Sequence, residues 1–254
     1  MSKAPESSLS SVLLCSKCRQ NRRNLPFVNF IACRYPLLKP LAFLQNLYIF
    51  SMVNLFFHAL KEIEMIKVIF LPGNGGSSVE DNWFPRVKQE LEEHGINVVA
   101  EDFPDSYLAR ELFWLPFLKN ELGADENSIL VGHSSGAVAA MRFAETNKIC
   151  GSVLIGVCHT DLGVETETLS GYYDRPWDWE KIKNNQKFIT IFASTDDPWI
   201  PVEEPRFIQK QLQCSYHEFT DQGHFGGDRE KNSFPELTQA ILKQIKKINP
   251  PQTL

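Results

Sequence analysis

The chain has 254 residues, 43% hydrophobic and 22% charged, which suits one α/β domain with a sizeable core or two small domains. The chain is acidic overall, with a formal net charge of −5, which gives no electrostatic footprint for nucleic acid, so we expect no nucleic-acid partner. Cys150, Cys158 and Cys214 are scattered among apparent core elements, which favours reduced thiols over a disulfide framework.

The charge is divided unevenly at about Met65. Residues 1–64 contain eight Lys or Arg and three Asp or Glu, whereas the remainder carries a net charge of −10. We therefore predict an N-terminal extension over 1–64 and a folded domain over 65–254. The extension could be an organelle-targeting peptide, an apolar membrane segment over 41–60 better suited to the interface than to spanning, or dispensable sequence. We expect membrane contact only through this extension. If the extension does not direct the chain to an organelle, we expect a cytoplasmic protein.

Beyond Met65, short apolar β-branched runs alternate with helical patterns. The predicted strands are 66–72, 96–102, 127–132, 151–157, 187–194 and 215–220. The predicted helices are 83–95, 107–123, 135–147 and 234–247. Strands without polar alternation, separated by amphipathic helices, indicate a parallel sheet covered on both faces. Right-handed crossovers then predict a doubly wound α/β fold with strand order 2-1-3-4-5-6.

A Gly-His-Ser-Ser-Gly segment, 132–136, lies between the third predicted strand and an Ala-rich helix. A G-x-S-x-G pattern in that position is typical of a nucleophile elbow, a sharp turn that lifts its central serine above the sheet edge. The pattern centres on Ser134. The alternative is a tight turn without chemistry, and the rest of the chain must decide between the two.

The partners of a serine nucleophile follow in the order that this architecture requires. Asp196 and Asp197 come after the fifth predicted strand, and His224 lies in a Gly-flanked loop after the sixth. A serine hydroxyl needs a base to take its proton, and that base needs a carboxylate to orient it. The sequence therefore predicts a triad of Ser134, His224 and one aspartate. The Asp197-Pro-Trp-Ile-Pro pattern favours Asp197 by analogy, and Asp196 stays open as a turn carboxylate.

The loop after the first strand, Pro-Gly-Asn-Gly-Gly over 72–76, occupies the position expected for an oxyanion donor. It lacks both glycine patterns of phosphate-binding loops. We expect the backbone N–H of Ser135, the residue after the nucleophile, as one donor. The second donor is expected from Asn74, with Gly75 as the alternative.

Several ordered segments, among them PGNGG, ARELFWLPF, GHSSGAVAAMRFAET, SGYYDRPWDWEKIK and FTDQGHF, resemble the retinoblastoma-binding protein 9 family of serine hydrolases over about 66–247. The resemblance implies an α/β-hydrolase fold, Ser134, Asp197 and His224 as the triad, and neither cofactor nor metal. The family's namesake can carry an L-x-C-x-E motif for retinoblastoma-type pockets. Here Ala124 stands in place of its cysteine, which puts pocket binding in doubt.

The substrate is the least determined part of the prediction. The connection after the fourth strand is too long for a simple loop, and it carries four aromatic residues that could roof the site or merely anchor the loop. These pocket candidates are Tyr172, Tyr173, Trp177 and Trp179. We expect a small-molecule or short peptide substrate, either an ester, a thioester or an amide. The alternative is a non-catalytic protein-binding module on a hydrolase scaffold.

Overall fold

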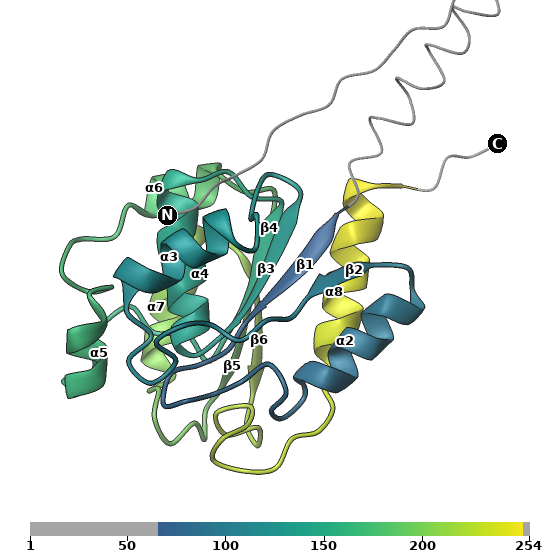
Figure 1. Ribbon diagram of the computed structural model, residues 1–254. Coiled ribbons are helices and arrows are strands. Elements are labelled where there is room, and N and C mark those ends of the chain that lie inside the picture. The colour runs from purple at the N-terminus through teal and green to yellow at the C-terminus, as the bar shows by residue number, and fades with distance from the viewer. Residues whose placement is uncertain (1–65, 251–254) are drawn as a thin grey trace, which may run out of the picture. The chain divides into compact units, whose positions relative to one another are not determined.

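A six-stranded parallel sheet runs through residues 66–250, the part of the chain that the computed structural model describes (Figure 1). The strands are β1 (Lys67–Leu71), β2 (Asn97–Val99), β3 (Ser128–His133), β4 (Gly151–Ile155), β5 (Ile189–Ser194) and β6 (Ser215–Phe219). Their order is β2-β1-β3-β4-β5-β6, so the predicted topology is confirmed. Because all strands run parallel, their carboxyl ends meet at one edge of the sheet, the carboxyl edge, and their amino ends at the other, the amino edge.

Strands β3, β4 and β5 are buried at every residue. Their side chains are mostly apolar on both faces, as expected where helices cover both sides of a parallel sheet. In the register of the sheet, Val131 of β3 lies between Phe70 of β1 and Val153 of β4. The sheet therefore separates two apolar clusters, one on each face.

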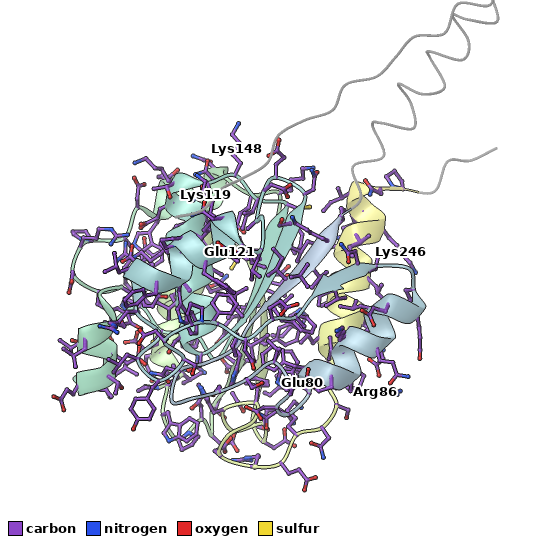
Figure 2. The ribbon with its side chains drawn as sticks, viewed as in Figure 1. Glu80, Arg86, Lys119, Glu121, Lys148 and Lys246 are labelled. Carbon is purple, nitrogen blue, oxygen red and sulfur yellow. The ribbon has the colours of Figure 1, made fainter. Side chains whose placement is uncertain are left out.

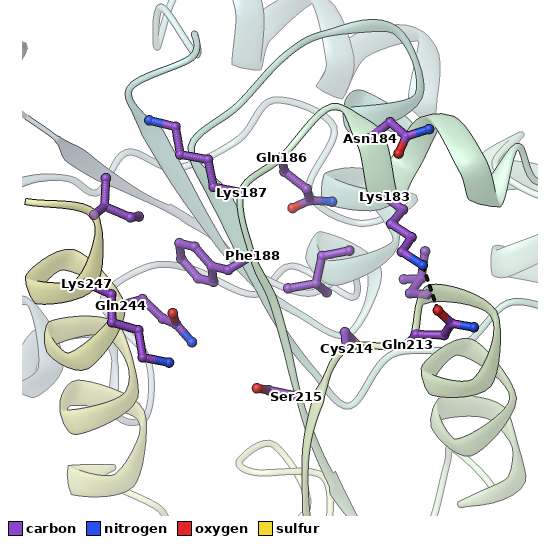
Figure 3. Close-up of a pocket in the computed structure, with 13 residues that line it drawn as sticks. Lys183, Asn184, Gln186, Lys187, Phe188, Gln213, Cys214, Ser215, Gln244 and Lys247 are labelled. Atoms are coloured by element: carbon purple, nitrogen blue, oxygen red, sulfur yellow. Dashed lines mark hydrogen bonds between the residues drawn. The ribbon is translucent and has the colours of Figure 1, made fainter.

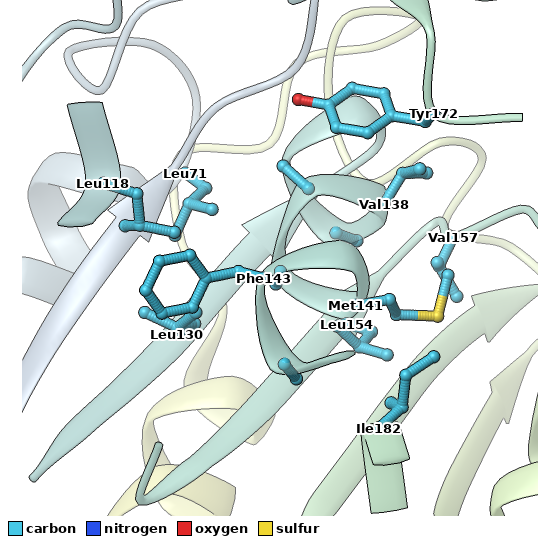
Figure 4. Packing of buried hydrophobic residues seen from close by; sticks show 14 of the residues in the cluster. Leu71, Leu118, Leu130, Val138, Met141, Phe143, Leu154, Val157, Tyr172 and Ile182 are labelled. Atoms are coloured by element: carbon cyan, nitrogen blue, oxygen red, sulfur yellow. The ribbon is translucent and has the colours of Figure 1, made fainter. Parts of the chain in front are cut away.

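Helices α2 (Phe84–Glu93) and α8 (Pro235–Ile248) cover one face, and α3 (Glu111–Asn120), α4 (Ser135–Thr146), α6 (Trp179–Asn184) and α7 (Glu203–Leu212) cover the other (Figure 1). Trp83, Leu91 and Ile241 belong to the first apolar cluster. Leu118, Phe143 and Ile182 belong to the second, which Figure 4 shows around α4. Charged side chains such as Arg86 and Lys246 point outward from the helices (Figure 2).

Helix α4 is buried from Ser135 to Glu145, including one arginine. Arg142 donates to the backbone carbonyls of Tyr172, Arg175 and Pro176, and its guanidinium lies 3.5 Å from the ring centroid of Trp177. It also pairs with Glu145 at 2.7 Å. A buried charge is tolerated only where its donors are satisfied, as they are here. Arg142 thereby fastens the segment 172–177 to the central helix.

The structure adds three helices that the sequence patterns did not predict. The long connection after β4 contains α5 (Glu165–Ser170) and α6, and α7 lies between β5 and β6. Helix α3 continues through Pro116, as expected, but begins at Glu111 rather than 107. The predictions for residues 1–64, including the boundary at Met65, lie outside the described residues. Among the described helices, none is both long and apolar enough to cross a membrane.

Candidate active site

Ser134 occupies a strained turn between β3 and α4. Its φ of 54° and ψ of −123° fall in a region that non-glycine residues rarely adopt, at a cost of about 1–3 kcal/mol. The flanking glycines make the turn possible. A Cβ at Gly132 would meet the backbone of Gly136, and one at Gly136 would meet the carbonyl oxygen of Leu71. The segment therefore has the geometry of a nucleophile elbow, with Ser134 at its apex.

His224 lies in the loop after β6 and is held there by its own backbone. Its N–H donates to Oδ1 of Asp228 at 3.0 Å, and its carbonyl accepts from Nε2 of His133 at 2.7 Å. The next carbonyl, of Phe225, accepts from the indole of Trp83 at 2.9 Å. These bonds fix the loop, so the imidazole is presented to the same cavity as Ser134.

Asp197, not Asp196, contacts the imidazole. Its Oδ2 lies 2.7 Å from Nδ1 of His224, and both side chains are 3% exposed. The other oxygen, Oδ1, accepts from the backbone N–H groups of Trp199 and Ile200, each at 2.9 Å. The carboxylate is thus oriented by two backbone donors and directed at one nitrogen of His224.

Asp196 has a different environment and makes no hydrogen bond to His224. Its Oδ1 accepts from Oγ of Ser194 at 2.6 Å and from the N–H of Gly223 at 2.9 Å, and its Oδ2 pairs with Arg229 at 3.0 Å. The Ser194 hydrogen bond, above all, lowers the pKa of Asp196. This is the turn carboxylate considered as the alternative in the sequence, and it braces the loop that carries His224.

His133, beside the nucleophile, is buried under the site. Burial, and secondly the neighbouring His224, lower the pKa of His133 to about 3. It is therefore neutral near pH 7 and acts as a hydrogen-bond donor to the backbone of His224.

The expected oxyanion donors differ in availability. Within residues 66–250, the backbone N–H groups of Asn74 and Ser135 have no hydrogen-bond acceptor; Ser135 follows the nucleophile in the elbow, and Asn74 lines the same cavity as Ser134. By contrast, the N–H of Gly75 donates to the carbonyl of Tyr107 at 3.0 Å. The structure therefore does not support Gly75 as a donor, and of the two glycine-loop alternatives it leaves Asn74.

A cavity of about 310 Å³ holds Ser134 and His224 together. The glycine loop, Asn82 and the tip of the His224 loop form its walls. Trp199 forms a further wall, 53% exposed, with its ring edge-on to His224 at a centroid distance of 4.8 Å. The sequence analysis did not single out Trp199, although its position two residues after Asp197 was a usable signal.

The four predicted pocket aromatics do not line this cavity. Tyr172 is fully buried in the core, and Trp177 and Trp179 stack on each other at 5.6 Å beside Arg142. Tyr173 is half-buried and donates to Glu167. These aromatic rings pack against α4 and α7, so they anchor the connection after β4. This is the alternative interpretation given in the sequence analysis.

Glu167 is a site residue that the sequence analysis missed. It lies on α5, and its Oε1 accepts from Nδ2 of Asn74 at 2.6 Å and from Oγ of Ser135 at 3.3 Å. Its Oε2 accepts from the hydroxyl of Tyr173 at 3.1 Å. Burial raises the pKa of Glu167, although these three donors act in the opposite direction. No local pattern marks one glutamate of a loop helix as the partner of a distant glycine loop.

A second, larger cavity of about 750 Å³ lies at the amino edge of the sheet (Figure 3). It is lined by the starts of β5 and β6 and by the ends of α6 and α8, including Lys183, Lys187, Phe188 and Lys247. It contains no aspartate, glutamate or histidine. Within residues 66–250, no group of three or more His, Cys, Asp or Glu side chains could hold a metal ion.

Known proteins similar to this chain are hydrolases. The sequence model of the serine hydrolase family matches residues 68–243. Serine hydrolase RBBP9 of Rattus norvegicus is 44% identical over 181 residues, which cover 70% of this chain and 95% of the rat protein. The putative hydrolase YdeN of Bacillus subtilis is 25% identical over 188 residues, covering 72% of this chain and 98% of its own.

Solved structures show the same fold. The crystal structure of the ydeN gene product of B. subtilis superposes with a TM-score of 0.65 at 24% identity, covering 71% of this chain and 99% of that one. MGS-M2, an α/β hydrolase from a deep-sea metagenome library, gives a TM-score of 0.56 at 15% identity over 72% and 90% of the two chains. The family resemblance expected from the sequence is confirmed: this chain belongs to the serine hydrolase family and has the α/β-hydrolase fold.

Proposed function

We propose that this protein hydrolyses a small ester, thioester or amide through an acyl-enzyme on Ser134. The single observation that carries the proposal is the 2.7 Å contact between Asp197 and Nδ1 of His224, at the cavity where the strained Ser134 also lies. With Nδ1 bonded to the carboxylate, Nε2 is the nitrogen left to take a proton. Nucleophile, base and orienting acid are all side chains, so this chemistry requires no cofactor.

The steps follow from these positions. Oγ of Ser134 attacks the substrate carbonyl while His224 takes its proton, and the oxygen of the tetrahedral intermediate gains a negative charge. The N–H groups of Asn74 and Ser135 would stabilise that charge, together with the positive end of the α4 dipole. His224 then returns the proton to the leaving group. Water, activated by the same histidine, hydrolyses the acyl-enzyme.

The cavity supports a small substrate. A volume of about 310 Å³ is at the low end for small-molecule sites, and Trp199 offers an apolar wall beside His224. A short peptide or small acyl compound fits these dimensions. The negative charge of the folded region gives no reason to expect a nucleic-acid partner.

The alternative of a retinoblastoma-type pocket partner has little support. In the segment Leu122–Glu126, Leu122 is 8% and Ala124 9% exposed, and both backbone N–H groups bond to α3. Docking this segment in a partner's groove would require it to leave the core. A cytoplasmic location is compatible with the free thiols of Cys150, Cys158 and Cys214.

The test is labelling by a fluorophosphonate probe, which reacts with activated serines whatever their substrate. Wild-type protein is expected to label, and Ser134→Ala is expected to abolish labelling while thermal unfolding stays unchanged, because the side chain lies at the surface of the cavity. Ser135→Ala keeps the backbone N–H that we assign to the oxyanion hole and should still label, at a reduced rate because it loses the Oγ contact to Glu167. Labelling that persists in Ser134→Ala, or is lost only in Ser135→Ala, would contradict the assignment.

A further inference from the structure

Glu167 joins the two residues that we assign to the oxyanion hole. Asn74 belongs to the loop after β1 and Ser135 to the start of α4, and within residues 66–250 these two residues form no hydrogen bond with each other. One oxygen of Glu167, Oε1, accepts from both side chains, at 2.6 Å from Asn74 and 3.3 Å from Ser135. A single carboxylate oxygen therefore spans the two walls of the site.

The carboxylate of Glu167 also has a hydrogen-bond partner on its other oxygen. Its other oxygen accepts from the hydroxyl of Tyr173, and that hydroxyl lies 3.1 Å from Sγ of Cys158. Because Tyr173 donates to Glu167, the buried Cys158 thiol is the donor to the tyrosine oxygen. Cys158, Tyr173 and Glu167 thus form a chain from the end of β4 to the oxyanion loop.

We propose that Glu167 is a positioning residue, which sets the spacing of the Asn74 and Ser135 backbone N–H groups by binding the side chains of the same two residues. The inference rests on the proposed function. An oxyanion hole acts only when its donors are preorganised at the position where charge develops. A misplacement of about 1 Å can cost roughly a hundredfold in rate, so a brace of this kind affects turnover without touching the substrate.

The role requires an acceptor oxygen at this position, not a negative charge. A glutamine at 167 keeps one carbonyl oxygen that can accept from both Asn74 and Ser135, whereas an alanine keeps none. The carboxylate's charge would by itself disfavour a nearby oxyanion. Glutamine and alanine variants therefore separate a positioning role from an electrostatic one.

The experiment measures kcat and KM for p-nitrophenyl acetate and the fluorophosphonate labelling rate. Glu167→Ala is expected to lower kcat and kcat/KM together by about 10- to 100-fold, with KM within about threefold, because the affected interaction forms only in the transition state. Glu167→Gln should recover most of that loss. Glu165→Ala, an exposed glutamate on the same helix, is the matched control and should equal wild type.

A second route removes the same hydrogen bond from the other side. Asn74→Ala deletes the amide but keeps the backbone N–H, and it should lower kcat in the same way. Combined with Glu167→Ala it should cost no more than Glu167→Ala alone, since that change already removes the hydrogen bond from Asn74. This variant also carries the test if Glu167→Ala proves unstable in thermal unfolding.

Three results with the Glu167 variants would overturn the inference: a kcat in Glu167→Ala within twofold of wild type or above it, a raised KM at unchanged kcat, or a glutamine variant as impaired as alanine. Additive losses in the double variant would do the same. Ser134→Ala is measured alongside. If it still labels, the proposed function fails; if it is silent and Glu167→Ala is unimpaired, only the positioning role fails.

Discussion

The two edges of the sheet differ in chemistry more than in shape. The amino edge has the larger cavity, about 750 Å³, but its charged residues are the solvated Lys183, Lys187 and Lys247, with no acid or histidine among them. The carboxyl edge has a cavity of about 310 Å³ in which a strained serine and a histidine paired with a buried aspartate meet. Cavity size therefore says little here about where the chemistry lies.

The reason is the parallel topology. Every strand ends at the carboxyl edge, so loops from β1, β3, β4, β5 and β6 converge there from distant parts of the sequence. Helix α4 begins at the same edge, which adds unpaired N–H groups. The amino edge receives helix ends and strand starts instead. The contrast between the edges can be challenged experimentally in three ways.

The largest effect is expected from the pair of adjacent aspartates at the carboxyl edge. Asp197→Asn should lower kcat by about 10⁴-fold, because an amide can hold His224 in the wrong tautomer. Asp196→Asn, the matched control, loses only part of a loop brace and should change kcat by about twofold. Steady-state kinetics with p-nitrophenyl acetate measure both. Equal losses, or a larger loss at Asp196, would move the acid to the neighbouring position.

A smaller effect concerns stability against pH. The pKa of His133 is about 3 in the folded protein and about 6.5 in an unfolded chain, so the unfolded state binds the extra proton between these values. Stability should therefore fall as pH drops from about 6.5 towards 3, by up to about 1.4 kcal/mol per pH unit from this group.

Urea unfolding at pH 7, 6, 5 and 4 measures that slope. His133→Gln keeps a donor for the carbonyl of His224 but cannot titrate, so its slope should be shallower than that of wild type in this window. Identical slopes of stability against pH in the two proteins would show that His133 does not generate the pH dependence.

The smallest effect, no change, is expected at the amino edge. β1 enters the sheet there at Lys67, and every described strand, helix and site residue follows it. We predict that a chain starting at Met65 folds and labels with the fluorophosphonate at the rate of the full chain. Thermal unfolding and labelling of both forms test this. Aggregation or lost labelling would mean that residues 1–64 belong to the domain.

The sequence was most informative where one local pattern implies one geometry. The buried apolar runs predicted the sheet and its order, and the glycines around Ser134 predicted the turn, since a Cβ at Gly132 or Gly136 has no room. The order of Ser134, Asp197 and His224 along the chain places all three at the ends of parallel strands. The order of these residues and strands along the chain is therefore enough to predict that the three residues lie at the same edge of the sheet.

It was least informative where contacts join segments far apart in the sequence. The hydrogen bond from Asn74 to Glu167 joins residues 93 positions apart, and no sequence pattern near either residue predicts it. From sequence alone, the aromatic residues at 172–179 suit a substrate pocket and a packed loop equally well. The structure favours the packed loop, because the buried guanidinium of Arg142 lies over the ring of Trp177. Likewise, the sequence near Gly75 does not indicate that its N–H donates to the carbonyl of Tyr107.

The satisfied guanidinium of Arg142 has a consequence for the timing of catalysis. Swinging the segment 172–177 away would strip a buried cation of three carbonyl acceptors, at a cost of several kcal/mol. Segment 172–177 is therefore expected to stay on α4 while substrate binds, and the exposed Trp199, on the loop after β5, borders the cavity instead. A catalytic cycle without movement of this segment predicts that a viscous solvent leaves kcat for p-nitrophenyl acetate unchanged.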